Sequence, residues 1–423
     1  MIKRMKEKKY SWKTFLPMYL IFISLFLFSS RDYATAQASA VGLSNIHRIL
    51  GISLSIVLVI IFFMQREKFR KPPFLLLLYT LYILIGYLSA FLFSKWFNYS
   101  LWKLIEMTAI ILVGYYIWAL AKSDRNIILE FYEQYILFIK FLLLTVLLSV
   151  VVMPSAALSI ASSVSDAYLP FRVSGQIIII NPLSVGTFSA MIFFDTFIQF
   201  LSGNRKRKTY FWIVLSAILL VLAQSRTSIF GLLVALLIFF ISAKQIRASI
   251  RYSILGFFSI AIMGMLPIIS SYLIRGASEE NIYSMSGRTT WWEFMWKKIT
   301  DADLTHQLIG FGFTSGEREI AAEISNGMMQ TLDSTYFSSL ASTGFLGTGI
   351  LILVVLLLTS KLFILAKNKR NHVVYSQALG IGIILLFKSL TTATMNVLTF
   401  YNMIFVILIL LVSIKPSYRR VLQ

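Results

Sequence analysis

The sequence predicts an all-α polytopic membrane protein, and three observations lead to that fold class. Of the 423 residues, 58% are hydrophobic and only 13% are charged, which is too apolar for a soluble protein of this length. Apolar runs recur along the chain at roughly the 20 residues that a helix needs to cross a bilayer. The alternating strands of about ten residues that mark a transmembrane barrel are not visible.

About twelve apolar runs are long enough to span, and each is expected to form one transmembrane helix. They are residues 15–29, 46–64, 73–93, 99–121, 134–153, 177–201, 209–225, 227–243, 252–274, 334–360, 373–391 and 395–414. The one long polar connection, residues 275–333, follows the ninth run. The chain is therefore divided into helices 1 to 9 (1–274), a large loop (275–333), and helices 10 to 12 with a tail (334–423).

Basic residues assign the two sides of this bundle. Twelve spans place both termini on one side, and the seven segments on that side hold 26 of the 39 Lys and Arg residues. The positive-inside rule makes that side cytoplasmic, so the long loop lies outside a cytoplasmic membrane. The net charge of +21 is then a topology signal that also favours contact with anionic lipids, and nucleic acid is not an expected partner.

The sequence points to chemistry without a cofactor. It has no cysteine, so disulfides and thiol catalysis are excluded. It has no phosphate-binding GxxxxGK[ST] loop and no HExxH pattern, and its three histidines are scattered. We therefore expect no metal and no nucleotide, and energy for a reaction would come from an activated membrane substrate.

The long loop is expected to carry helices of its own. It contains nine of the 18 acidic residues, and a structureless segment of this length would be unusual in a compact protein. Ser286 is a candidate cap for a helix that begins near Arg288. Trp291, Trp292 and Trp296 would lie on this helix, either as interface anchors or as a platform for sugar rings, and position alone does not separate the two.

Arginines gather near the outer ends of the predicted spans. They are Arg172, Arg226, Arg275 and Arg288. A single arginine at the membrane edge commonly extends its guanidinium to water, but several on one face suggest a site for an anion such as a diphosphate. Asn181, which precedes Pro182, is placed at the same level, where Pro182 would start or interrupt a helix.

Closely spaced residues in two spans suggest packing roles. Lys103 and Glu106 lie three residues apart in the fourth run and are expected to pair within the bundle. Gly344 and Gly347 are expected to let the tenth span approach its neighbours.

Four local stretches resemble the bacterial O-antigen polymerase and ligase group, which transfers sugars carried on polyprenyl diphosphate. They are FRVSGQIIIINPLSVG, AQSRTSIFG, SGRTTWWEFMWKKI through HQLIGFGF, and DSTYFSSLASTGFLG. Ligases of this group usually carry His, a polar residue, nine variable residues and GxxG at the end of the outer loop. Here the spacing to Gly344 and Gly347 is kept, but Asp333 occupies the histidine position. This departure favours the polymerase branch, which makes O-antigen, capsule or exopolysaccharide.

The resemblance implies a metal-independent glycosyltransferase that acts on polyprenyl-diphosphate-linked oligosaccharide. Asp333 would activate the acceptor hydroxyl, although a carboxylate at this position could equally cap the following helix. Arg226 and Arg288 would stabilise the departing diphosphate. The further candidates for substrate binding are Arg172, Arg275, Asn181, Trp291 and Trp292.

Two other functions stay open. A ligase of the same group would pass the glycan to lipid A core or another acceptor. A transporter or flippase of lipid-linked sugars would instead place charges near mid-membrane along a central pathway. A chain-length regulator and a flippase of the same pathway are candidate protein partners.

Overall fold

The computed structural model describes residues 11–26, 46–65, 71–160, 171–242, 288–325, 331–367 and 372–414, together with the isolated positions 249 and 256. This part of the chain is helical except for one small two-stranded sheet. The first elements are η2 (Trp12–Phe15), α1 (Leu16–Phe26), α2 (Ile46–Met64), α3 (Phe74–Phe93), α4 (Phe97–Leu120), α5 (Ile127–Val152) and α6 (Pro154–Ala157). Next come β1 (Leu158–Ile160), β2 (Phe171–Val173), α7 (Pro182–Leu201), α8 (Arg207–Ala223) and α9 (Arg226–Ser242). The last are α13 (Arg288–Thr300), α14 (Leu304–Ile309), α15 (Ser315–Ser325), α16 (Thr335–Ala366), α17 (His372–Thr391) and α18 (Phe400–Leu411).

The described helices form a polytopic membrane protein. Seven of them are long and apolar enough to cross a bilayer, and three shorter apolar helices accompany them. The predicted spans coincide with α1, α2, α3, α4, α5, α7, α8, α9, α16, α17 and α18 over most of their length. The predicted run 252–274 lies outside the described residues.

Four predicted bounds differ from the structure by five residues or more. Helix α7 begins at Pro182 rather than at 177, and α16 continues to Ala366 rather than ending at 360. The starts of α5 and α18 also differ, and each has a local reason. The fifth helix, α5, begins at Ile127 rather than at 134, because the apolar pattern continues through IILEFYE even though Glu130 and Glu133 interrupt it. The last helix, α18, begins only at Phe400, after a non-helical segment in which Thr399 caps it by accepting from the backbone N–H of Asn402 at 3.1 Å.

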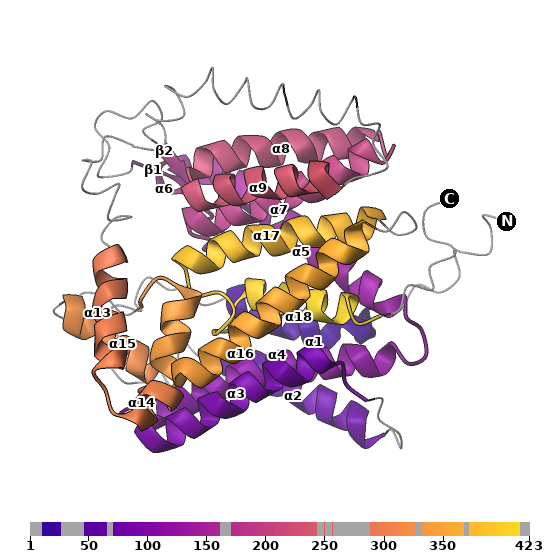
Figure 1. Ribbon diagram of the computed structural model, residues 1–423. Coiled ribbons are helices and arrows are strands. Elements are labelled where there is room, and N and C mark those ends of the chain that lie inside the picture. Colours follow the sequence, from indigo (N-terminus) through magenta and orange to yellow (C-terminus); the bar gives the residue numbers. More distant parts are fainter. Residues whose placement is uncertain are drawn as a thin grey trace.

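Helix α18 lies at the centre of the bundle. Every residue from Tyr401 to Leu411 is buried, which agrees with a helix that is apolar on all sides. Helices α3, α4, α5 and α17 pack against it, and α16 crosses in front of it (Figure 1). Helices α7, α8 and α9 form a layer that packs on the rest of the bundle through α17 and, at α7, through α5.

The long helix α16 is broken at Gly344, whose φ of 61° and ψ of −164° are not helical. A Cβ at this position would lie 2.4 Å from the carbonyl carbon of Leu308, at the end of α14. Gly344 therefore provides both the break and the close approach of α14, which is more than the expected helix packing. Gly347 differs from the expectation too, because a Cβ at this position would lie 2.2 Å from Oγ1 of Thr343 in its own helix.

The expected helices in the long loop are present as α13, α14 and α15, which we call the helical insertion. The insertion has a small apolar core that it shares with the start of α16 and that includes Met295, Ile299, Ile320 and Leu340. It lies at one end of the bundle, on the left in Figure 1.

Lys103 and Glu106 pair at 3.1 Å on α4, as predicted. Arg48 of α2 joins them with its Nε 2.7 Å from the fully buried carboxylate of Glu106. This network fixes α2 to α4 at a point where three charges share the bundle interior.

Candidate functional site

One end of the bundle gathers charged side chains from five elements. Arg172 lies on β2, Arg226 and Arg288 are the first residues of α9 and α13, Asp333 precedes α16, and Lys388 lies in the last turn of α17. The corresponding ends of these elements face the left side of Figure 1. Arg172 and Lys388, which are 216 residues apart in the sequence, therefore belong to one region of the structure.

Arg288 and Asp333 form the central contact. The guanidinium Nη2 of Arg288 donates to Oδ2 of Asp333 at 3.3 Å, and Thr331 donates to the other carboxylate oxygen at 3.3 Å. Both charged side chains are partly exposed, at 22% for Arg288 and 37% for Asp333. A carboxylate held this way is oriented by its neighbours and still accessible to a ligand.

Asp333 does not cap α16. The position before the helix is Ser334, and neither its side chain nor that of Asp333 makes a capping hydrogen bond. Asp333 instead has a left-handed backbone, with φ of 48°. Such a conformation is unfavourable for most residues and persists when the surrounding structure enforces it, which is common at functional sites.

Arg226 is brought close to Arg172 by the turn between α8 and α9. Gln224 ends α8 with φ of 51°, and its side chain donates to the carbonyl of Phe171 at 3.0 Å, which ties β2 to this turn. Arg226 lies near enough to Arg172 and Arg288 for both charges to act on it. Three of the four arginines that the sequence predicted, Arg172, Arg226 and Arg288, therefore form one cationic group.

Lys388 is a member of the site that sequence reasoning missed. It is 2% exposed, and the charges of Asp333 and Arg288 both reach it. Its neighbours fix α17 to the rest of the site: Ser389 donates to the hydroxyl of Tyr336 at 3.1 Å, and Thr391 contacts Thr227 of α9 at 3.2 Å. The sequence feature that could have identified it is a single lysine inside an apolar run. Placing such a charge within a membrane span is costly unless the side chain faces a polar partner or ligand.

The other predicted candidates have varied surroundings. Asn181 caps α7, with its side chain accepting from the N–H of Ser184 at 2.7 Å, and Pro182 starts this helix as predicted. Trp292 stacks on Phe337 of α16 with ring centres 5.2 Å apart, so it attaches α13 to α16. Trp291 is half-buried on α13. Arg275 and the candidate cap Ser286 lie outside the described residues.

The site carries an excess of positive charge. Among the described residues, the cationic side chains of Arg172, Arg226, Arg288 and Lys388 surround the carboxylate of Asp333. Guanidinium and ammonium groups at the edge of a low-dielectric region bind phosphate oxygens through charge-assisted hydrogen bonds. The arrangement can thus hold a strongly anionic group beside a partly exposed carboxylate.

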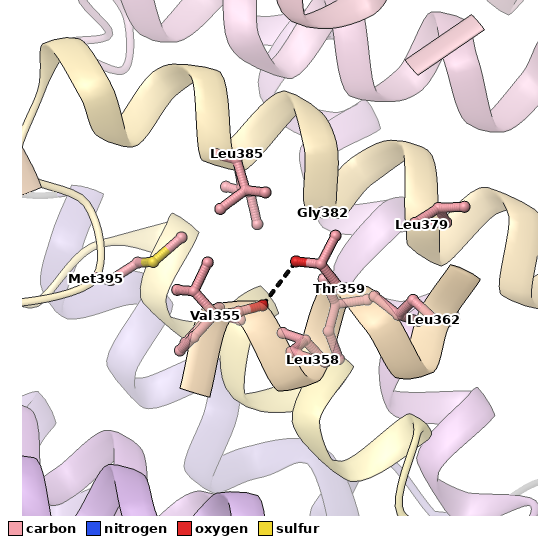
Figure 2. Close-up of a pocket in the computed structure, with 11 residues that line it drawn as sticks. Val355, Leu358, Thr359, Leu362, Leu379, Gly382, Leu385 and Met395 are labelled. Atoms are coloured by element: carbon pink, nitrogen blue, oxygen red, sulfur yellow. Dashed lines mark hydrogen bonds between the residues drawn. The ribbon is translucent and has the colours of Figure 1, made fainter. Parts of the chain in front are cut away.

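Two other features of the bundle do not belong to this site. Asp195 of α7 is buried among Tyr132, Lys140 and Gln199, whose amide donates to it at 2.8 Å, so this carboxylate is occupied by protein partners. A small apolar hollow lies between α16, α17 and α18 (Figure 2). Its labelled side chains, among them Leu358, Leu385 and Met395, carry no charge.

The fold and the site define a class: a polytopic membrane protein with a cationic, carboxylate-containing site at one end of its helices. Comparison with known families makes this specific. Residues 211–352, about a third of the chain, match the family described as O-antigen ligase. A comparison with curated proteins finds no match.

The matched segment runs from α8 into the first part of α16 and contains Arg226, Arg288, Asp333, Gly344 and Gly347. Arg172 and Lys388 lie outside it. The family implies an enzyme of glycosyltransferase type that acts on lipid-linked glycans in polysaccharide or lipopolysaccharide biosynthesis.

Proposed function

We propose that this protein is a polysaccharide polymerase that joins oligosaccharide repeat units carried on polyprenyl diphosphate. The observation that carries the proposal is Asp333, an accessible carboxylate held against Arg288 and surrounded by further cations. The family match supports glycan transfer, and an aspartate where ligases usually have histidine favours the polymerase branch.

In the proposed reaction the acceptor hydroxyl of one lipid-linked unit attacks the anomeric carbon of the glycan on another. The new glycosidic bond forms as the bond from that carbon to the diphosphate oxygen breaks. Asp333 accepts the hydroxyl proton, a role worth typically about 10²- to 10⁴-fold in rate. The polyprenyl diphosphate leaves as an anion stabilised by Arg226, Arg288 and Lys388, with Arg172 holding the donor.

The proposed topology is that of the positive-inside analysis. About twelve spans place both termini in the cytoplasm and the helical insertion on the outer face, with the long loop at 275–333 between the ninth and tenth spans. The site then lies at the outer surface, where lipid-linked units are available after they have crossed the membrane. A metal or nucleotide is not part of the proposed mechanism.

A test in cells compares the polymer made by a deletion strain that carries single variants. Asp333→Asn keeps the size of the side chain and tolerates the left-handed backbone, so it removes the charge alone. We expect Asp333→Asn and Arg288→Ala to leave single repeat units on the surface, where the wild type makes long chains. Lys95→Ala, which removes an exposed pair with Glu319, is the matched control and should make full-length polymer.

Full-length polymer from Asp333→Asn at normal protein level would refute the role of Asp333. A ligase would give a different pattern, because its loss leaves polymer on the lipid carrier and removes it from the final acceptor.

A further inference from the structure

We propose that Glu317 is a positioning residue for Asp333, which it fixes through the backbone of Leu332 and the hydroxyl of Ser338. The inference rests on the proposed role of Asp333. Glu317 lies on α15 of the helical insertion and is 3% exposed. A carboxylate is costly to bury, so its two oxygens need defined partners.

Both oxygens of Glu317 bind residues that flank Asp333. Oε1 accepts from the N–H of Leu332 at 3.0 Å, and Oε2 accepts from the hydroxyl of Ser338. Leu332 immediately precedes Asp333, and Ser338 lies in the first turns of α16. One side chain therefore clamps the turn on both sides of Asp333.

The clamp is continued by the segment that leads into α18. Asn396 donates to the hydroxyl oxygen of Ser338 at 2.6 Å. Thr335 donates to the carbonyl of Thr392 at 3.0 Å and accepts from the N–H of Thr394 at 2.9 Å. Asp333 thus lies between fixed neighbours, which explains how its left-handed backbone is maintained.

Burial of Glu317 raises the pKa of its carboxyl to about 7, and the negative charge of Asp333 acts in the same direction. The hydrogen bonds from Ser338 and Leu332 and the charge of Arg318 oppose this shift. Tyr82 of α3 also lies within electrostatic range. Glu317 is assigned to the positioning of Asp333 because of its hydrogen bonds to Leu332 and Ser338, and not because of its pKa.

Kinetics of the purified full-length protein test the inference, with extension of a lipid-linked repeat unit as the assay. Glu317→Ala should lower kcat by about 10- to 100-fold with KM nearly unchanged, because misplacing a reacting group by about 1 Å costs on that order. Glu317→Gln should stay within about threefold of wild type, since its amide oxygen still accepts from Leu332. Glu319→Ala, two residues away and exposed, is the matched control.

A double-mutant cycle separates positioning from general destabilisation. In an Asp333→Asn background, Glu317→Ala should cost less than about twofold further, because residues that act as one unit are non-additive. Should Glu317→Ala fail to fold, Ser338→Ala removes one half of the clamp and must show the same non-additivity.

Two outcomes overturn the inference. The first is an equal loss from Glu317→Ala with and without Asp333, and the second is unchanged kcat in Glu317→Ala. Full activity of Asp333→Asn alone is a different result, which would overturn the proposed function and the inference with it.

A readout independent of activity is available because the chain has no cysteine. A thiol placed by Asp333→Cys should react with a maleimide at a rate that changes at least severalfold when Glu317→Ala is added. An unchanged rate would show that Glu317 does not orient position 333.

Discussion

At the residue scale, Lys388 shows how tertiary structure creates a site that a sequence only hints at. The sequence suggested four members of the site, because charges at the ends of apolar runs are unusual and the stretches that resemble the polymerase and ligase group contain them. These members are Arg172, Arg226, Arg288 and Asp333. Lys388 lies inside an apolar run, and nothing local indicates which face of its helix meets Asp333. Only the packing of α17 beside α9 and α16 places it there.

Lys388→Met is expected to lower kcat/KM for repeat-unit extension by about 10²- to 10³-fold, the scale of losing one preorganised donor. Methionine has a similar length, and removing a buried charge relieves its desolvation, so the variant should remain folded. Lys95→Met, at an exposed lysine, is the control and should be unaffected. Wild-type kinetics in Lys388→Met would exclude Lys388 from the site.

The pKa of Glu317 also predicts how stability depends on pH. Its folded-state pKa of about 7 exceeds the ordinary value of 4.5, so the folded state binds the proton more tightly. The stabilisation from this proton is complete below about pH 4.5 and is lost as the pH rises through about 7. The apparent Tm of Glu317→Gln minus that of the wild type should therefore increase as the pH rises from about 5 to about 8. A constant difference between the two proteins across this range would contradict a raised pKa.

At the element scale, the sequence predicted that the helices exist. It did not predict the break in α16 or the late start of α18. Apolar runs predict spans because a bilayer requires internally satisfied backbones. The break in α16 depends on contact with α14. The two helices are separated along the chain by α15 and come together only when the insertion packs against α16. The delayed start of α18 depends on Thr399, which caps the helix, and on Thr394 and Asn396, which donate to α16 instead of extending α18.

Gly344→Ala should destabilise the protein by several kcal/mol, because Gly344 has a backbone conformation almost restricted to glycine and contacts Leu308 closely. Gly349→Ala, in the same helix with open space around its Cβ position, is the matched control and should be neutral. Thermal unfolding of the purified variants distinguishes them. Equal Tm values for the two would show that the break in α16 is not required.

At the scale of the whole molecule, the sequence predicted a polytopic helical membrane protein with helices in its long loop, and the structure confirms both. The orientation in the membrane remains a prediction because it rests on the distribution of basic residues. The count of twelve spans remains one because the run 252–274, apart from position 256, lies outside the described residues.

Single cysteines test the orientation directly in a chain that has none of its own. Thr300→Cys, exposed at the end of α13, should react with a membrane-impermeant maleimide in intact cells. Ser123→Cys, exposed between α4 and α5, should react only after permeabilisation. The reverse pattern would place the insertion in the cytoplasm and remove the basis of the proposed topology.

We propose that this chain alone polymerises lipid-linked repeat units at the site around Asp333. The most direct measurement incubates the purified wild-type protein and Asp333→Asn with one lipid-linked repeat unit, in the presence of a chelator and without nucleotide. We expect the wild type to make a ladder of products in which successive products differ by one repeat unit. We expect Asp333→Asn to leave the substrate unreacted. Absence of a ladder from the wild type, combined with transfer to an added lipid A core acceptor, would contradict the account and identify a ligase.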